Sequence, residues 1–157
     1  MGKKTILIRE NSFEKARNSV NKNKDKQIIF SSDNDELNRK VLEKLPIHFL
    51  LINQSKRKDK QKQRDSGFNH VLAKIAKKKN ISLGINLDEI INSKGKVKTE
   101  ILARIRQNIK LCNKNKIKMN FINIKKENER DIHDLKALGL VLGMPTWMTS
   151  SLKTNLF

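Results

Sequence analysis

The stretch that decides the fold is residues 67–86, GFNHVLAKIAKKKNISLGIN. After a short loop, its apolar residues recur every three or four positions while lysines occupy the outer face, which predicts an amphipathic helix at 69–79. The apolar run ISLGI at 81–85 follows directly and predicts a buried strand. A helix followed at once by a buried strand is the repeating unit of a mainly parallel α/β sheet.

The same alternation runs along the whole chain. Further short apolar runs predict strands at 5–8 (TILI), 27–30 (QIIF), 48–52 (HFLLI) and 119–124 (MNFINI). Helices are predicted at 12–21, 35–45, 97–115 and 134–142, with a short amphipathic tail at 146–152. About five to six βα units are too few for a standard (β/α)₈ barrel, which typically needs about 250 residues. The sequence therefore predicts an α/β fold with a reduced or open barrel, as a single domain over residues 1–157.

Side chains at the predicted helix ends support these boundaries. Ser12 and Asp33 are predicted to cap their helices, and Glu36 completes a capping box with Asp33. Pro145, shortly after Gly143, is predicted to stop the last well-defined helix. In the long helix at 97–115 one face is apolar, and the opposite face carries Arg106, Gln107, Lys110 and Lys114.

Composition indicates the class of partner. The net charge is +19, from 35 Lys and Arg against 16 Asp and Glu, and such an excess repels itself unless an anionic partner balances it. No apolar run approaches the roughly 20 residues that span a membrane, and the start MGKKTILIREN lacks an apolar run of signal-peptide length. One cysteine, Cys112, excludes an internal disulfide and agrees with a reducing compartment. We expect a cytoplasmic protein with a polyphosphate partner and no membrane contact.

The basic residues gather in three consecutive segments: a linker at 54–66 without any apolar residue, the helix at 69–79, and the loop after Asn92. Each alone could be a solvated face, but the three together with the net charge favour an electrostatic nucleic-acid footprint. The predicted RNA-binding residues are Lys56, Arg57, Lys58, Lys60, Lys62, Arg64, Lys74, Lys77, Lys78, Lys94, Lys96 and Lys98. With no Tyr and one Trp, contact with a folded RNA through phosphates and shape is favoured over base stacking. The linker is expected to be mobile in the free protein.

Few residues have the types and spacings that catalysis needs. His48, His70 and His133 lie too far apart for the HxH or HExxH spacings of metal sites. His48 is predicted to be a strand-end histidine and His133 to join surface ion pairs with Asp131 and Asp134. The ring of His70 could cap local backbone, bond a neighbouring loop or face RNA, and the structural role is favoured.

The acidic residues and the single thiol also give no indication of catalysis. The predicted strands end in Asn53, Asn86 and Asn123 rather than in Asp or His. Asp88 and Glu89 follow a strand at the expected barrel mouth, where barrel enzymes keep catalytic groups, but interaction with a helix dipole is favoured. Cys112 lies on an apolar helix face and is predicted to be inert. We therefore predict no catalytic and no metal-binding residue.

Four short motifs follow one another along the chain. A G-x-[DN]-H-V-L segment is matched by Gly67, Asn69, His70, Val71 and Leu72, and a G-[IF]-[NS]-[LF] segment by Gly84, Ile85, Asn86 and Leu87. A segment like LRQNIRLC is matched by Ile105, Arg106, Gln107, Asn108, Ile109, Leu111 and Cys112. The last motif is matched by Arg130, Asp134, Leu135, Gly139, Leu140, Val141, Leu142, Gly143 and Met144. In order and spacing, these segments resemble the archaeal ribonuclease P protein component 3 family, which also occurs in eukaryotic ribonuclease P.

This resemblance implies a shortened, TIM-barrel-like member of the family. The family's opening βα unit has no counterpart, its small residues after the last strand are replaced by Asn123, Ile124 and Lys125, and a proline is replaced by Ile132. The resemblance further implies a noncatalytic subunit of the endoribonuclease that removes the 5′ leader of precursor tRNA. Magnesium would be bound by the catalytic RNA, no cofactor by the protein, and protein component 2 would be its partner.

Two other functions remain open from the sequence. A general RNA- or ribosome-binding protein would carry the same charge. A metal-dependent phosphoesterase of the related barrel superfamily would need clustered histidines, which the sequence does not offer.

Overall fold

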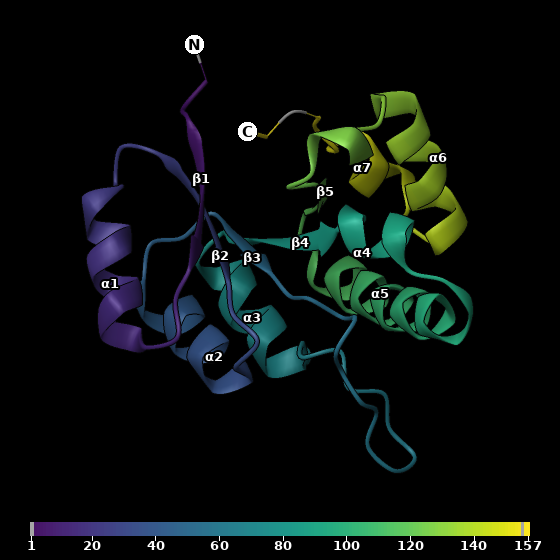
Figure 1. Cartoon of the computed structure of the whole chain (residues 1–157), viewed down its shortest axis with the longest axis horizontal. Helices are drawn as coiled ribbons and strands as arrows, with labels where there is room; N and C mark the ends of the chain where they lie inside the picture. Colours follow the sequence, from purple (N-terminus) through teal and green to yellow (C-terminus); the bar gives the residue numbers. More distant parts are fainter. Residues whose placement is uncertain (1, 155) are drawn as a thin grey trace.

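Five parallel strands form one sheet in the computed structural model, which describes residues 2–154 and 156–157 (Figure 1). The strands are β1 (Thr5–Arg9), β2 (Gln27–Ser31), β3 (Phe49–Leu51), β4 (Ser82–Asn86) and β5 (Met119–Ile122). Their spatial order, β1-β2-β3-β4-β5, is also their order in the sequence. A barrel keeps this order, whereas a doubly wound sheet reverses it part-way. Because β1 and β5 end the row without pairing to each other in the described chain, the barrel is open, which confirms the predicted fold class.

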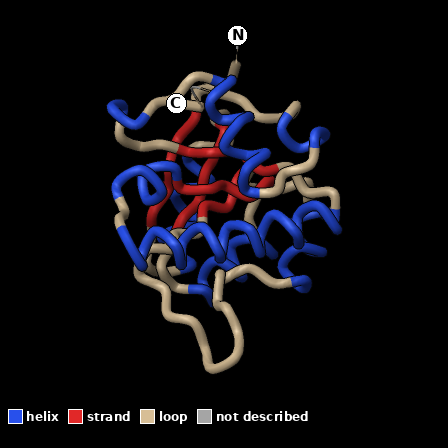
Figure 2. The backbone as a smooth tube through the Cα atoms, turned by 90° about the vertical axis from the view of Figure 1, so that its right-hand side faces the viewer, coloured by secondary structure: helices blue, strands red, loops and turns tan. Residues whose placement is uncertain are grey.

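The helices connect the strands and cover one side of the sheet (Figures 1 and 2). They are α1 (Phe13–Lys22), α2 (Asp35–Lys44), α3 (His70–Lys78), α4 (Leu87–Asn92), α5 (Gly95–Asn115), η1 (Lys126–Asn128), α6 (Ile132–Leu142) and α7 (Thr146–Thr149). The predicted boundaries hold within about two residues, except that α4 is a separate short helix before α5. Because α5 already begins at Gly95, two residues before the predicted start, Lys96 lies on this helix rather than in the predicted loop. None of the described helices combines the length and apolar character needed to cross a membrane.

Capping side chains explain where most helices begin. Ser12 caps α1 as predicted, accepting a hydrogen bond from the Lys15 amide. The predicted cap of α2 is wrong by one residue, because Asn34 rather than Asp33 accepts the Leu37 amide at 3.1 Å. Several residues before α2 can cap a helix, and tertiary packing selects among them. At the other end of the chain, α6 stops as predicted at Gly143, whose φ of +103° favours glycine.

The two faces of the sheet differ in size and chemistry. The helix-covered face forms the main core, which draws buried side chains from Ile8 to Leu152. The inner face holds a small apolar cluster of Ile29, Phe49, Leu51 and Ile122, with the partly buried Leu7 and Leu156 packed against it. It is tightly filled at Gly84, where a Cβ atom would lie 2.5 Å from Ile122 Cδ1. The inner face is therefore a packed interior rather than a channel.

Polar residues replace this apolar layer at the carboxyl ends of the strands. Arg9, Ser31, Asn53 and Asn86 stand two residues beyond inner-face positions of their strands, and strand residues two apart share a face. Asn86 Nδ2 donates to Asn53 Oδ1 at 2.9 Å, and Asn53 Nδ2 reaches Ser31 Oγ at 3.5 Å. This is the end of a barrel at which barrel enzymes place their functional groups.

Candidate nucleic-acid interface

The basic segment 54–66 is bound to α5 by one buried arginine. Arg104, with 2% of its side chain exposed, donates to Asp59 Oδ1 at 3.0 Å, to the Gln54 carbonyl at 3.1 Å and to the Arg57 carbonyl at 3.0 Å. These contacts join residues 45 to 50 positions apart in the sequence. The segment expected to be mobile is thus attached at three points, although its tip projects from the molecule in both overall views (Figures 1 and 2).

Sequence reasoning missed Arg104, yet a signal was present. In the 3.6-residue period of α5, position 104 falls with the buried Ile101, Ile105 and Asn108 rather than with the exposed Arg106. A charged side chain in an apolar stripe is buried only when it is paired. The pattern therefore indicated a buried ionic contact, but not its partners.

Arg57 also has a structural role. Its guanidinium donates to both Asp35 oxygens at 2.9 and 2.6 Å and to Asp65 Oδ1 at 2.9 Å, while Nε donates to the Asp65 carbonyl at 2.8 Å. Burial alone would raise the pKa of Asp65, but the bonds from Arg57 and from the Gly67 amide hold this pKa below its ordinary value. Arg57 was predicted to bind RNA, which stays a prediction; in the structure two carboxylates already surround its charge. The exposed loop cations are Lys56, Lys58, Lys60, Lys62 and Arg64.

At the end of this loop, the residue that precedes one motif contacts a second motif that is far away in the sequence. The Ser66 hydroxyl donates to Asn108 Oδ1 at 2.6 Å, and Gln54 Nε2 donates to the Ser66 carbonyl at 2.8 Å. Gly67 follows with φ of +74°, and a Cβ atom there would lie 2.8 Å from the Arg57 guanidinium. Asn69 then caps α3 by accepting the Leu72 amide at 3.0 Å. The G-F-N-H segment is therefore fixed by contacts with α5 and with Arg57.

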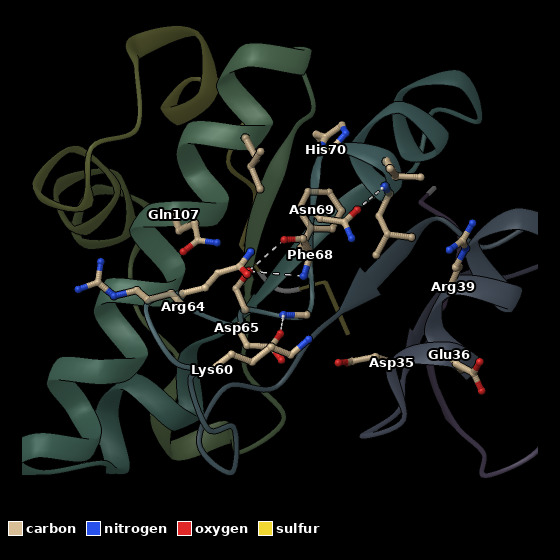
Figure 3. A pocket seen from close by; sticks show the side chains of 16 residues that line it. Asp35, Glu36, Arg39, Lys60, Arg64, Asp65, Phe68, Asn69, His70 and Gln107 are labelled. Atoms are coloured by element: carbon tan, nitrogen blue, oxygen red, sulfur yellow. Dashed lines mark hydrogen bonds between the residues drawn. The ribbon is translucent and has the colours of Figure 1, made fainter.

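His70 has no structural bond of the kind that was favoured. Asn69 performs the capping, and the exposed His70 side chain makes no hydrogen bond within the described part of the chain. The imidazole instead borders a cavity of about 480 Å³, which we call the α3 pocket. Its walls come from the start of α2, the second half of the basic loop, the start of α3 and the middle of α5. Figure 3 shows Arg39 on one side, Gln107 on the other, and Asn69 and His70 between them.

The exposed cations extend along the length of α5. The Lys77 ammonium donates to the Lys116 carbonyl at 3.1 Å, which joins the ends of α3 and α5. The exposed Lys74 and Lys78 of α3 therefore lie near the C-terminal half of α5, which carries Arg106, Lys110 and Lys114. Lys94, Lys96 and the half-buried Lys98 stand near the opposite end of this helix, which is about 30 Å long. The three predicted clusters thus lie on or near α5, which adds exposed cations that the prediction left out.

The paired acids after β4 hold loops. Asp88 accepts the amides of Ile124 and Lys125 at 2.8 and 3.2 Å, and the Asn128 side chain at 2.8 Å. Glu89 accepts the amides of residues 54 and 55 at 2.8 and 3.1 Å. The bonds to Asp88 also explain why β5 ends before the predicted residue 124. Both carboxylates lie at the start of α4 as expected, but their partners are the loop segments that follow β5 and β3.

The remaining motif positions have mainly structural contacts. Asn86 caps α4, and Arg106 approaches the Val141 carbonyl of α6 at 3.5 Å. Arg130 donates to the carbonyls of residues 127 and 129, and with Asp134 it borders a small apolar hollow between α4 and α6. Ile132, which replaces a family proline, is the first residue of α6, a position where proline is also favoured.

The histidines and the cysteine were predicted with mixed success. His48 is a strand-end histidine as predicted: Nδ1 accepts the Ile28 amide at 3.0 Å, and burial, with a contribution from Lys3, lowers its pKa. The predicted ion pair of His133 is wrong for the described residues, because Asp131 caps α6 by accepting the His133 amide. Cys112 lies fully buried on the apolar face of α5 as predicted, and burial raises its pKa to about 12.

The fold and this surface define an open-barrel α/β protein with exposed cations on and beside its longest helix. No family model matches the chain. Ribonuclease P protein component 3 of Methanothermobacter thermautotrophicus is 28% identical over 141 residues, which cover 88% of this chain and 54% of the relative. The chain therefore spans about half the length of this curated relative. In an archaeal ribonuclease P structure determined with mature tRNA, one chain matches the fold with a TM-score of 0.78 and 22% identity, over 93% of this chain and 62% of that chain. These comparisons confirm the resemblance to the archaeal ribonuclease P protein component 3 family.

Proposed function

We propose that this chain is a protein subunit of ribonuclease P that supports a catalytic RNA in removing the 5′ leader of precursor tRNA. The observation that carries the proposal is the bond from Ser66, the residue before one family motif, to Asn108 within another, close to the exposed cations of the loop and α3. The family resemblance supplies the identity of the RNA, because charge alone would suit any polyphosphate.

The protein would act without catalysing the reaction. Its exposed cations would neutralise neighbouring phosphates and so lower the magnesium concentration that the RNA needs to fold. Magnesium would reside on the RNA, and the protein would bind no cofactor. Asp88 and Glu89, two acids that follow a strand at the barrel mouth, are already engaged with backbone amides, which supports a noncatalytic role for the protein.

The partners would be the ribonuclease P RNA, protein component 2 and, through the complex, precursor tRNA. Their identity rests on the family resemblance. A cytoplasmic location follows from the same proposal, since precursor tRNA of an archaeal cell is processed there.

Copurification tests the proposal. A tagged chain expressed in its own cells should bring down one structured RNA together with component 2. A mixture of RNAs would instead favour a general RNA- or ribosome-binding protein and refute the subunit proposal. In reconstitution, adding the chain with component 2 to the RNA should shift leader removal to lower magnesium.

The chain alone should cleave nothing. Magnesium-dependent cleavage of precursor tRNA by rigorously RNA-free protein would overturn the noncatalytic role. It would also revive the phosphoesterase alternative, which the positions of His48, His70 and His133 on separate elements do not favour.

A further inference from the structure

We propose that the α3 pocket binds one unpaired nucleotide of an RNA strand, with the base inside and its phosphate at the rim. This inference deepens the proposed function and rests on RNA being the partner. It differs from the expectation of contact through phosphates and duplex shape alone, because a base held in a duplex cannot enter a pocket.

The size and the floor of the pocket suit a nucleobase. Its volume of about 480 Å³ falls within the roughly 300–1,000 Å³ of small-ligand sites. Phe68 and Leu72, both nearly buried, and the half-buried Leu111 supply apolar surface at its base. A flat aromatic heterocycle would cover this surface and be removed from water in turn.

Two planar side chains stand at the opening. Neither His70 nor Arg64 has a side-chain hydrogen bond among the described residues, although both border the pocket. Imidazole and guanidinium planes are surfaces on which unstacked RNA bases pack. Lys60, also at the rim, adds a point charge for the phosphate.

Side-chain amide groups remain available to form hydrogen bonds with the edge of a base. Gln107 is half-buried on the α5 wall and its side chain makes no bond to any described residue. Asn69 uses its oxygen to cap α3, which leaves its NH₂ group as a donor. On the opposite wall, Glu36 offers an acceptor for an exocyclic amino group, while Arg57 compensates the charge of Asp35.

The pocket is formed before any ligand arrives. The Ser66–Asn108 bond, the Asn69 cap and the Arg57 contacts hold the segment that carries His70. Ordering this segment therefore costs nothing at the moment of binding, and a pre-organised site retains more of its contact energy.

Binding of two RNAs to the full-length chain tests the proposal. A single-stranded oligonucleotide and a fully paired hairpin, whose loop is a non-nucleotide linker, are titrated with equal numbers of phosphates at one salt concentration, with fluorescence anisotropy as the readout. His70→Ala and Gln107→Ala should each weaken single-strand binding about tenfold, as expected for one base contact, and leave hairpin binding within about twofold. His133→Ala and Gln61→Ala, which change the same side-chain types outside the pocket, should leave both affinities unaltered.

Imidazole NMR signals give a second measurement that does not depend on mutation. The chain has three histidines, so each signal can be assigned. On titration with nucleoside monophosphates, the His70 signals should shift while those of His48 and His133 stay in place. Equal affinity for strand and hairpin, together with an unshifted His70, would overturn the pocket.

Failure of the pocket and failure of the proposed function look different. If the pocket variants bind the strand like wild type but the chain still copurifies with one structured RNA, only the pocket is refuted. If the chain copurifies with a mixture of RNAs while the His70 effects persist, the subunit proposal fails and the pocket stands.

Discussion

Replacing Arg104 with alanine should destabilise the protein and release the basic loop. The side chain is 2% exposed, and its guanidinium donates to two backbone carbonyls of the loop, at residues 54 and 57. Hydrogen bonds from charged groups contribute roughly 1.5–3 kcal/mol each, so the two carbonyl bonds alone predict a loss of at least about 3 kcal/mol. The pair with Asp59 is left out of this figure because that carboxylate lies at the solvent. In a chain of 157 residues such a loss lowers Tm by roughly 6–12 °C.

The assay combines thermal melts with limited trypsin digestion of the loop. Arg106→Ala is the matched control, because this arginine lies on the same helix but is exposed, and surface changes of this kind alter stability by about 0.5 kcal/mol or less. The Arg104→Ala protein should be cleaved in the loop, at residues 56–64, well before wild type. Should both variants melt together and resist trypsin equally, the loop would not be held by Arg104 and this reasoning would be refuted.

Four further predictions concern pH, the loop, salt and the thiol. Since burial lowers the pKa of His48, the unfolded chain takes up this proton first as the pH falls, so unfolding free energy from urea titrations should drop as pH falls below the ordinary value of 6.5. His48→Gln should flatten this dependence, and an unchanged slope would contradict the assignment. Replacing the exposed loop cations with Gln should leave Tm unchanged and weaken RNA binding, whereas Arg57→Gln should lower Tm. A lower Tm for the loop variant and an unchanged Tm for Arg57→Gln would show that the loop cations, and not Arg57, are structural. RNA affinity of the wild type should fall by ~10³ between about 50 and 200 mM salt if six phosphates are contacted, and a flat response would exclude the exposed cations as the RNA-binding surface. Cys112 should resist thiol reagents near pH 8 until denaturant is added, since its pKa of about 12 keeps it protonated; rapid labelling of the native protein would disprove its burial.

Local signals predicted the elements of the fold well. The five strands, which are three to five residues long, and the main helices with a 3.6-residue apolar period were predicted within about two residues, because side-chain spacing along one element decides which face can be buried. The wrong predictions concern positions where several local structures fit the sequence equally well. Either Asp33 or Asn34 can cap α2, and either a loop or a helical turn can carry Lys96, so packing against the rest of the chain decides.

The candidate site was predicted in outline only. Clusters of Lys and Arg could be found from composition, but which cation is free depends on acids elsewhere. Arg57 meets Asp35 across 22 residues, while Lys62 meets none in the described chain. His70 was placed correctly at the start of its helix, yet its side-chain environment was not, since the neighbouring Asn69 made the capping bond instead.

The sequence by itself determined the class of fold, the strongly basic character and the order of the motifs, because each of these depends on residue type and spacing alone. Only the tertiary structure decided how these parts work together. It brought Asn108 to Ser66 and Arg104 to the loop, and it left His70 and Gln107 open to a shared pocket. The physical reason is that hydrogen bonds and ion pairs act over about 3 Å, so their partners are chosen by proximity in space and not by proximity along the chain.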